Sequence, residues 1–316
     1  MNDTRTVADF QKFTFSGHLR SHVYKVLDEN IKLGHADYTC YWILELMCSG
    51  LVHSCWNTIF LSSAIHINRG APNVFLYLVS QYERFAHYEN MYSTMTMTDI
   101  RNNPDARFLF CEVGASVALC RKSKLPTLHR IKPEHDFHQT VIQENLKSPS
   151  SMYARPIMKQ EDPMELYVPI NEFVYCLEIR DTSRALYWVA WVLTYSAKYK
   201  IDNKTHLVCS YRSNDYVEEK YLRSPIWILW SAVLEQSKRT PQVVQYIEAL
   251  YKMYCLRWAQ GDLKKRIPFL INSILFLCES LDLNYKVPNN MSLVQDVVSN
   301  IPQWIEAIVH TKKTFA

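Results

Sequence analysis

Apolar residues recur every three or four positions along most of this chain, which is the periodicity of an α-helix that buries one face. Glycines and prolines fall between these periodic stretches, where helices stop and start. We therefore expect an all-α protein. The pattern predicts helices over 16–34, 37–50, 52–66, 72–85 and 105–122, and then over 172–180, 183–198, 224–234, 240–254, 264–280 and 300–310.

The pattern changes between Lys124 and Pro169. Prolines occur at 126, 133, 149, 156, 163 and 169, with Ser148-Pro149-Ser150-Ser151 in the middle. Proline lacks a backbone N–H and disfavours helix in the residue before it. We expect a mostly irregular linker in which 134–147 has room for one short helix. The predicted division is an N-terminal helical bundle over 1–123, a Pro-rich linker over 124–169 and a C-terminal helical bundle over 170–316.

The two predicted bundles carry similar markers in the same order, which predicts an internal duplication. Stacked helical repeats bury a continuous core in this way. The alternative is that any two helical stretches rich in Trp and Tyr look alike. The paired markers are Tyr41-Trp42 and Tyr187-Trp188, Trp56 and Trp230, Tyr82–Phe85 and Tyr251–Tyr254, and the helices Arg107–Cys120 and Arg266–Cys278.

The amino-acid composition limits the kinds of chemistry that this protein is expected to perform. Hydrophobic residues make up 48% of the 316 positions, enough for a large core, but only 6 are glycine. Neither GxxxxGK[ST] nor GxGxxG occurs, so the glycine-rich loops that cradle phosphates are missing. We expect no ATPase or dinucleotide chemistry and no cofactor. The Trp188/Trp191 and Trp227/Trp230 pairs have apolar neighbours, which favours a place in the core over a stacking platform for bases.

Reactive side chains form no recognisable catalytic motif. The cysteines number nine, an odd count without a CxxC pair, and most lie in apolar runs, so we expect reduced core thiols. The densest ligand cluster, His135 and His138 beside Glu134 and Asp136, is typical of a solvated loop and lacks further ligands at zinc spacing. No GxSxG occurs. Because no catalytic motif is visible, we expect no enzyme. No stretch reaches ~18 apolar residues without a charge, so we expect no membrane span.

Two basic clusters are better candidates for function. The formal net charge is +4, and positive residues gather at the end of one apolar helix and at the start of its counterpart. Like charges at a helix N-terminus oppose the helix dipole, so a phosphate backbone or an acidic protein would favour them. Ordinary solvated surface is the alternative. The candidate contact residues are Arg121, Lys122, Lys124, Lys264, Lys265 and Arg266.

Several strings carry a resemblance to a known family. The segments Tyr38–Gly50 and His66–Tyr77, together with Arg184–Val189, Ile226–Trp230 and Lys265-Arg266, are similar to a helical protein family of nucleocytoplasmic large (giant) DNA viruses. The resemblance covers nearly the whole chain. It implies a viral protein of the cytoplasmic factory or the nucleus, with no enzymatic residue to carry over. The tandem bundles also resemble the collar of clamp loaders, as an analogy of architecture only.

These observations favour a non-catalytic interaction subunit, accessory to viral DNA replication or transcription. It would dock other proteins of a viral complex, or DNA or RNA, through the basic helix ends. The alternative is a virion structural protein, as a minor capsid or scaffold component. An enzyme without a recognisable motif is the third possibility.

Overall fold

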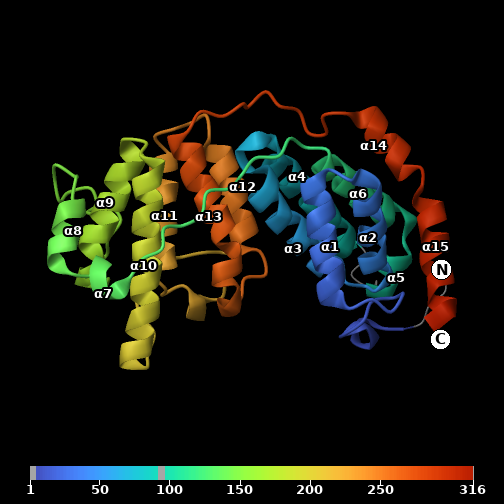
Figure 1. The fold of residues 1–316 in the computed structure, drawn as a ribbon, viewed down its shortest axis with the longest axis horizontal. Helices are drawn as coiled ribbons and strands as arrows, with labels where there is room; N and C mark the ends of the chain where they lie inside the picture. The colour runs from blue at the N-terminus through green and yellow to red at the C-terminus, as the bar shows by residue number, and fades with distance from the viewer. Residues whose placement is uncertain (1–4, 92–96, 316) are drawn as a thin grey trace. The chain divides into compact units, whose positions relative to one another are not determined.

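The computed structural model describes residues 5–91 and 97–315 of the chain, and within these ranges it contains helices and no β-strand (Figure 1). The all-α prediction is confirmed. The chain forms two compact units. Unit 1 comprises 1–124 together with 282–316, and unit 2 comprises 125–281. None of the helices within the described ranges combines the length and the apolar character needed to cross a membrane.

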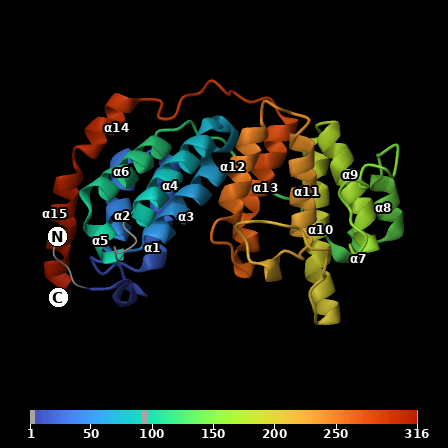
Figure 2. The same cartoon turned by 180° about the vertical axis from the view of Figure 1, so that it is seen from behind.

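In unit 1, helix α2 is central and packs against α1, α3, α6, α14 and α15 (Figure 1, Figure 2). The core between them is lined by Cys40, Leu44 and Cys111, all fully buried. A short π-helix, Ser63–Ile67, extends α3. The helices of unit 1 are α1 (Arg20–Leu33), α2 (Ala36–Cys48), α3 (Val52–Ser62), α4 (Asn73–Met91), α5 (Met97–Asn102), α6 (Pro104–Ala118), α14 (Met291–Val298) and α15 (Ile301–Phe315).

In unit 2, helix α9 packs against α10, α11 and α13, and α13 packs against α10, α11 and α12. Trp188 and Trp191 are buried on α10, and Trp227 and Trp230 are buried on α11, as their apolar neighbours predict. The helices of unit 2 are α7 (Pro133–Asp136), α8 (Gln139–Asn145), α9 (Tyr167–Glu178), α10 (Thr182–Asn203), α11 (Ile226–Ser237), α12 (Val244–Cys255) and α13 (Leu263–Cys278).

The division into units differs from the one predicted at 123 and 169. The Pro-rich stretch belongs to unit 2, where Ala154 and Ile157 are buried and Trp191 Nε1 donates to the Asp136 carbonyl at 3.0 Å. Its expected short helix occurs as α7 and α8. The last segment returns to unit 1, where Val294 and Ile308 pack into the core of α2 and α6. Periodicity shows which face of α14 and α15 is apolar, but it does not show which bundle covers that face.

The predicted duplication stays a prediction, and two sets of equivalent contacts favour it. Arg107 on α6 donates Nε to the Arg101 carbonyl at the end of α5, at 3.0 Å. Arg266 on α13 donates Nη1 to the Tyr254 carbonyl near the end of α12, at 2.7 Å. In each unit a tryptophan also packs against two rings of a following helix. The ring centroids are 5.4 and 5.9 Å apart for Trp56 with Tyr82 and Phe85, and 5.1 and 5.0 Å for Trp230 with Tyr251 and Tyr254.

Candidate functional site

Arg121 makes its contacts inside unit 1. Its Nε donates to the Gly70 carbonyl at 2.7 Å, and its Nη2 pairs with Asp282 Oδ2 at 2.9 Å. The guanidinium also lies 5.1 Å from the centre of the Tyr285 ring. This arginine therefore fastens the 282–285 segment to the turn before α4, and about half of its side chain is left exposed.

Lys122 caps the helix that it follows. Its Nζ donates to the carbonyls of Val117, Ala118 and Cys120 at 3.1, 2.6 and 2.9 Å. The last carbonyls of a helix have no partner within the helix, and a cation there also suits the helix dipole. Burial lowers the pKa of Lys122 to about 8. Lys124, two residues on, has an exposed side chain.

Arg266 is likewise a capping residue, although the sequence places it in a basic cluster. Only 5% of its surface is exposed. Its Nη1 donates to the Tyr254 and Leu256 carbonyls at 2.7 and 2.6 Å, and its Nη2 lies 3.7 Å from Asp262 Oδ2. Lys264 and Lys265 are exposed, and Lys265 Nζ lies 3.8 Å from Asp262 Oδ1. Asp262 at the start of α13 therefore offsets the positive charge there.

The six basic candidates therefore do not act alike. Arg121, Lys122 and Arg266 are occupied by contacts within their own unit, whereas Lys124, Lys264 and Lys265 keep exposed side chains. A sequence shows that these residues are charged and adjacent. It does not show that a neighbouring helix end accepts hydrogen bonds from some of them.

Most of the cysteines are shielded from solvent. All nine are free, and all except Cys278 are buried. Burial disfavours the thiolate, which is the reactive form. It raises the pKa of six of these thiols to about 12: Cys48, Cys120, Cys176, Cys209, Cys255 and Cys278.

A serine, a histidine and an aspartate meet in unit 1, a cluster that the sequence analysis missed. Ser62 Oγ donates to Asp28 Oδ1 at 2.6 Å, and His66 Nε2 lies 3.0 Å from the same oxygen. In a nucleophilic triad the serine bonds to the histidine, which removes its proton. Here the serine donates to the carboxylate instead, so the three side chains tie α1 to the end of α3. A signal for this pair is present in the sequence: Ser62 and His66 lie four residues apart on one predicted helix, a spacing that places both on the same face.

Potential metal ligands are dispersed. His135 and His138 are exposed, and His135 Nδ1 lies 3.7 Å from Asp136 Oδ1. Within the described ranges, no group of three or more His, Cys, Asp or Glu side chains is arranged to hold a metal ion.

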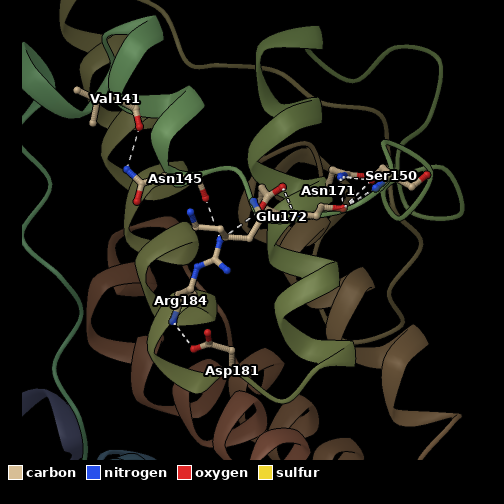
Figure 3. Close-up of polar contacts among 9 residues, drawn as sticks. Val141, Asn145, Ser150, Asn171, Glu172, Asp181 and Arg184 are labelled. Carbon is tan, nitrogen blue, oxygen red and sulfur yellow. Dashed lines mark hydrogen bonds and ion pairs between the residues drawn. The ribbon is translucent and has the colours of Figure 1, made fainter.

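Two adjacent residues of α9 hold the loop that joins α8 to the Pro-rich turns; we call residues 145–154 the anchored loop (Figure 3). Glu172, only 2% exposed, accepts hydrogen bonds from the backbone N–H groups of Lys147 and Ser148, both at 2.9 Å. Arg184 Nη2 lies 3.3 Å from Glu172 Oε2 and donates to the Asn145 carbonyl at 2.8 Å. These bonds fix the first half of the loop.

Asn171 fixes the second half. Its Oδ1 accepts from the Ala154 N–H at 3.1 Å, and its Nδ2 donates to Ser148 Oγ at 3.1 Å and to the Ser150 carbonyl at 2.8 Å. A side-chain amide can satisfy donors and acceptors together, which suits a loop without regular backbone pairing. The anchored loop is therefore ordered by side chains of α9.

The far half of this loop forms one wall of a pocket of about 350 Å³, which we call the recess. Its apolar floor is formed by Ile157, Val174 and Ala232, which are 5%, 8% and 1% exposed. At the rim, Arg239 Nη1 lies 3.1 Å from Glu178 Oε2. The remaining lining residues are Ser150, Met152, Tyr153, Pro156, Glu235 and Gln236.

Apolar and polar groups share the lining of the recess about equally, with three buried apolar side chains on its floor and charged groups at its rim. Its volume is at the lower end of the range for ligand pockets, about 300–1,000 Å³, which is enough for an apolar anchor and little more. In comparisons with known proteins, no family model, no curated protein and no solved structure matches this chain.

Proposed function

We propose that this protein is a non-catalytic interaction subunit that docks a partner protein at the recess of unit 2. The recess itself carries the proposal. Val174 and Ala232 form a buried apolar floor, the wall is held in place by Asn171 and Glu172, and the rim is charged. Preformed, well-packed pockets that receive one large side chain are typical of the most energetic part of a protein interface.

The chemistry of the lining indicates the occupant. The floor favours a large apolar side chain. The rim carries two carboxylates, Glu178, which pairs with Arg239 at 3.1 Å, and Glu235, which pairs with Lys238 at 2.6 Å. A lysine or arginine beside an apolar anchor can share these carboxylates, because a carboxylate accepts several hydrogen bonds. We therefore propose a partner segment of that composition.

The setting of this function follows from the sequence resemblance. We propose an accessory role in viral DNA replication or transcription, in the cytoplasmic factory or the nucleus of the host. The exposed Lys124, Lys264 and Lys265 would contact separate acidic segments of the same viral complex. The second candidate is a virion structural protein, and the docking site would then hold a neighbouring capsid or scaffold protein.

A site-specific photo-crosslinker at position 152 tests the docking site in infected cells. Met152 lines the recess and is 51% exposed, whereas Met164 is 76% exposed and does not line it, so position 164 is the matched control. We expect position 152 to capture a protein segment with a large apolar residue next to Lys or Arg. A synthetic peptide of that segment should bind about tenfold more weakly to Met152→Glu and unchanged to Met164→Glu.

Other results contradict the proposal. Cross-links from position 152 to nucleic acid, to a second copy of this chain, or to the same peptides as those captured at position 164 would rule out this occupant. Binding of the protein to double-stranded DNA is measured as a second test. Binding that weakens steeply with salt and is lost in Lys264→Glu with Lys265→Glu would assign the function to nucleic acid instead. Arg266 is left unchanged in that variant because it caps α12.

A further inference from the structure

The anchored loop carries a half-buried serine between exposed residues. Ser148 precedes Pro149, and Lys147, Pro149, Ser150 and Ser151 are all exposed around it. A serine followed by proline in an exposed, irregular segment is the substrate of proline-directed protein kinases. The residue before a proline is biased toward an extended backbone, which is the form that a kinase cleft accepts.

The hydroxyl of Ser148 is part of the network that orders the loop. Its Oγ donates to the Ser150 carbonyl at 2.6 Å and accepts from Asn171 Nδ2 at 3.1 Å. Esterification of this oxygen removes the proton that it donates. The bond to the Ser150 carbonyl, which closes the turn, is then lost.

The charge that a phosphate brings is unfavourable at this position. A phosphoserine carries a charge of about −1.5 to −2 at pH 7. The backbone N–H of the same residue is bonded to Glu172 Oε1 at 2.9 Å, so the new charge lies beside a carboxylate that is 2% exposed. The cation at that carboxylate is Arg184, whose Nη2 is already shared between Glu172 and the Asn145 carbonyl. Like-charge repulsion therefore opposes the anchored conformation.

We propose that Ser148 is a regulatory phosphorylation site and that its phosphate releases the anchored loop from α9. A proline-directed kinase transfers the γ-phosphoryl group of ATP. The Oγ–P bond forms, the bond from phosphorus to the ADP oxygen breaks, and the hydroxyl proton passes to the base of the kinase. Release removes Ser150, Met152 and Tyr153 from the wall of the recess. The consequence for docking rests on the proposed function, whereas the release itself does not.

The experiment treats the purified full chain with a proline-directed serine kinase and ATP, and locates the phosphate by mass spectrometry. We expect the phosphate on Ser148, and none at this position in Ser148→Ala. Chymotryptic cleavage after Tyr153, in the second half of the loop, should be about tenfold faster in the phosphorylated protein because the loop opens more readily. Absence of phosphate at Ser148, or phosphate with unchanged cleavage, overturns the proposal.

Two aspartate variants separate charge from folding. Ser148→Asp should accelerate the same chymotryptic cleavage after Tyr153. Ser151→Asp, with an equal charge on an exposed side chain of the same loop, should leave it unchanged. Peptide binding at the recess is measured on the same samples. Faster cleavage with unaltered binding would refute docking at the recess and leave the modification site standing. Equal cleavage in both variants would refute the role of Glu172 and Asn171 in the switch.

Discussion

A buried glutamate fastens a loop in each unit, but the two loops differ in their exposure to water. In unit 1, Glu45 is fully buried on α2 and accepts from the N–H and the Oγ of Ser16 at 2.8 and 2.7 Å. Thr14, Phe15 and Ser16 around it are themselves 1–3% exposed. In unit 2, Glu172 holds Lys147, which is exposed, and Ser148, which is half-buried.

The difference shows that the same kind of hydrogen bond contributes differently to stability in buried and in exposed surroundings. When the acceptor of a buried donor is removed, the donor stays without a hydrogen bond and the folded state loses stability. When the acceptor of an exposed donor is removed, water can take its place. Glu45 therefore locks its segment permanently. Glu172 needs the counter-ion Arg184 and holds a loop that can be released. The buried loop is structural, and the half-exposed loop is suited to control.

Asp162 sharpens this comparison because it is a fully buried acid in unit 2. Its side chain is 0% exposed and pairs with both Nη atoms of Arg212, at 3.0 and 2.6 Å. Asp162→Asn should lower the free energy of unfolding by about 3–5 kcal/mol, since it leaves the Arg212 charge buried and unpaired. Urea unfolding measures this. Asp202→Asn, half-exposed on α10, is the control and should cost less than about 1 kcal/mol.

Lowering the pH should remove the stabilisation that the pair of Asp162 and Arg212 provides. Burial raises the pKa of Asp162, but the hydrogen bonds and charge of Arg212 outweigh burial, so the pKa lies below its ordinary value of 3.8. A lowered pKa means that the stabilisation is present above pH 3.8 and is lost as pH falls below it. Thermal unfolding from pH 6 to pH 2 should show the gap between wild type and Asp162→Asn closing only below pH 3.8. A constant gap would show that the charge of Asp162 is not the source.

Glu45→Gln tests the buried loop directly. The amide keeps one acceptor for Ser16 but loses the charge, and it places a donor where none is needed. We expect a loss of about 2–3 kcal/mol, measured by urea unfolding. Glu29→Gln on the exposed face of α1 should change stability by less than about 0.5 kcal/mol. Equal effects of the two variants would contradict the structural role of Glu45.

Glu172→Gln tests the half-exposed loop. Because water can reach Lys147 and Arg184 is 27% exposed, we expect a smaller loss of about 1–2 kcal/mol. Tryptic cleavage after Lys147 should nevertheless become faster than in Glu45→Gln. If Glu172→Gln costs as much as Glu45→Gln, the contrast between the two loops is wrong.

Glu178→Ala should give the smallest effect. Its ion pair with Arg239 is exposed on both sides, at 42% and 60%, and exposed pairs contribute about 0–1 kcal/mol. We expect unfolding to change by less than about 0.5 kcal/mol, while binding of a basic peptide at the recess weakens. Arg239→Ala, which removes the cation instead, should not weaken that binding.

The sequence predicts the helices better than their partners. The predicted helix from 16 begins at Arg20, because Ser16 is bonded to Glu45 and cannot cap it. The helix predicted to end at 198 continues to Asn203, where Lys204 turns the chain at a positive φ of 58°. The local hydrophobic pattern predicts neither of these helix ends, because each depends on the contacts or the backbone geometry of a single residue.

The candidate site was less predictable than the fold. Lys122 and Arg266 lie in basic runs that are typical of surface, yet Lys122 caps the helix that it follows and Arg266 caps the end of the neighbouring helix α12. The recess arises where the anchored loop crosses α9 and α11, and no local pattern near Val174 or Ala232 indicates a pocket. Ser148-Pro149 was visible in the sequence, but its bonds to Glu172 and Asn171 were not.

The return of the chain to unit 1 has a consequence for synthesis on the ribosome. Residues 125–281 are contiguous, so unit 2 can fold as soon as they emerge, whereas unit 1 lacks α14 and α15 until the segment after unit 2 has also been synthesised. Until then Leu44 and Cys111 lack their cover from Val294 and Ile308. While unit 2 is being synthesised, the nascent chain therefore exposes an apolar surface on α2 and α6. A chaperone that recognises exposed apolar surface would bind there.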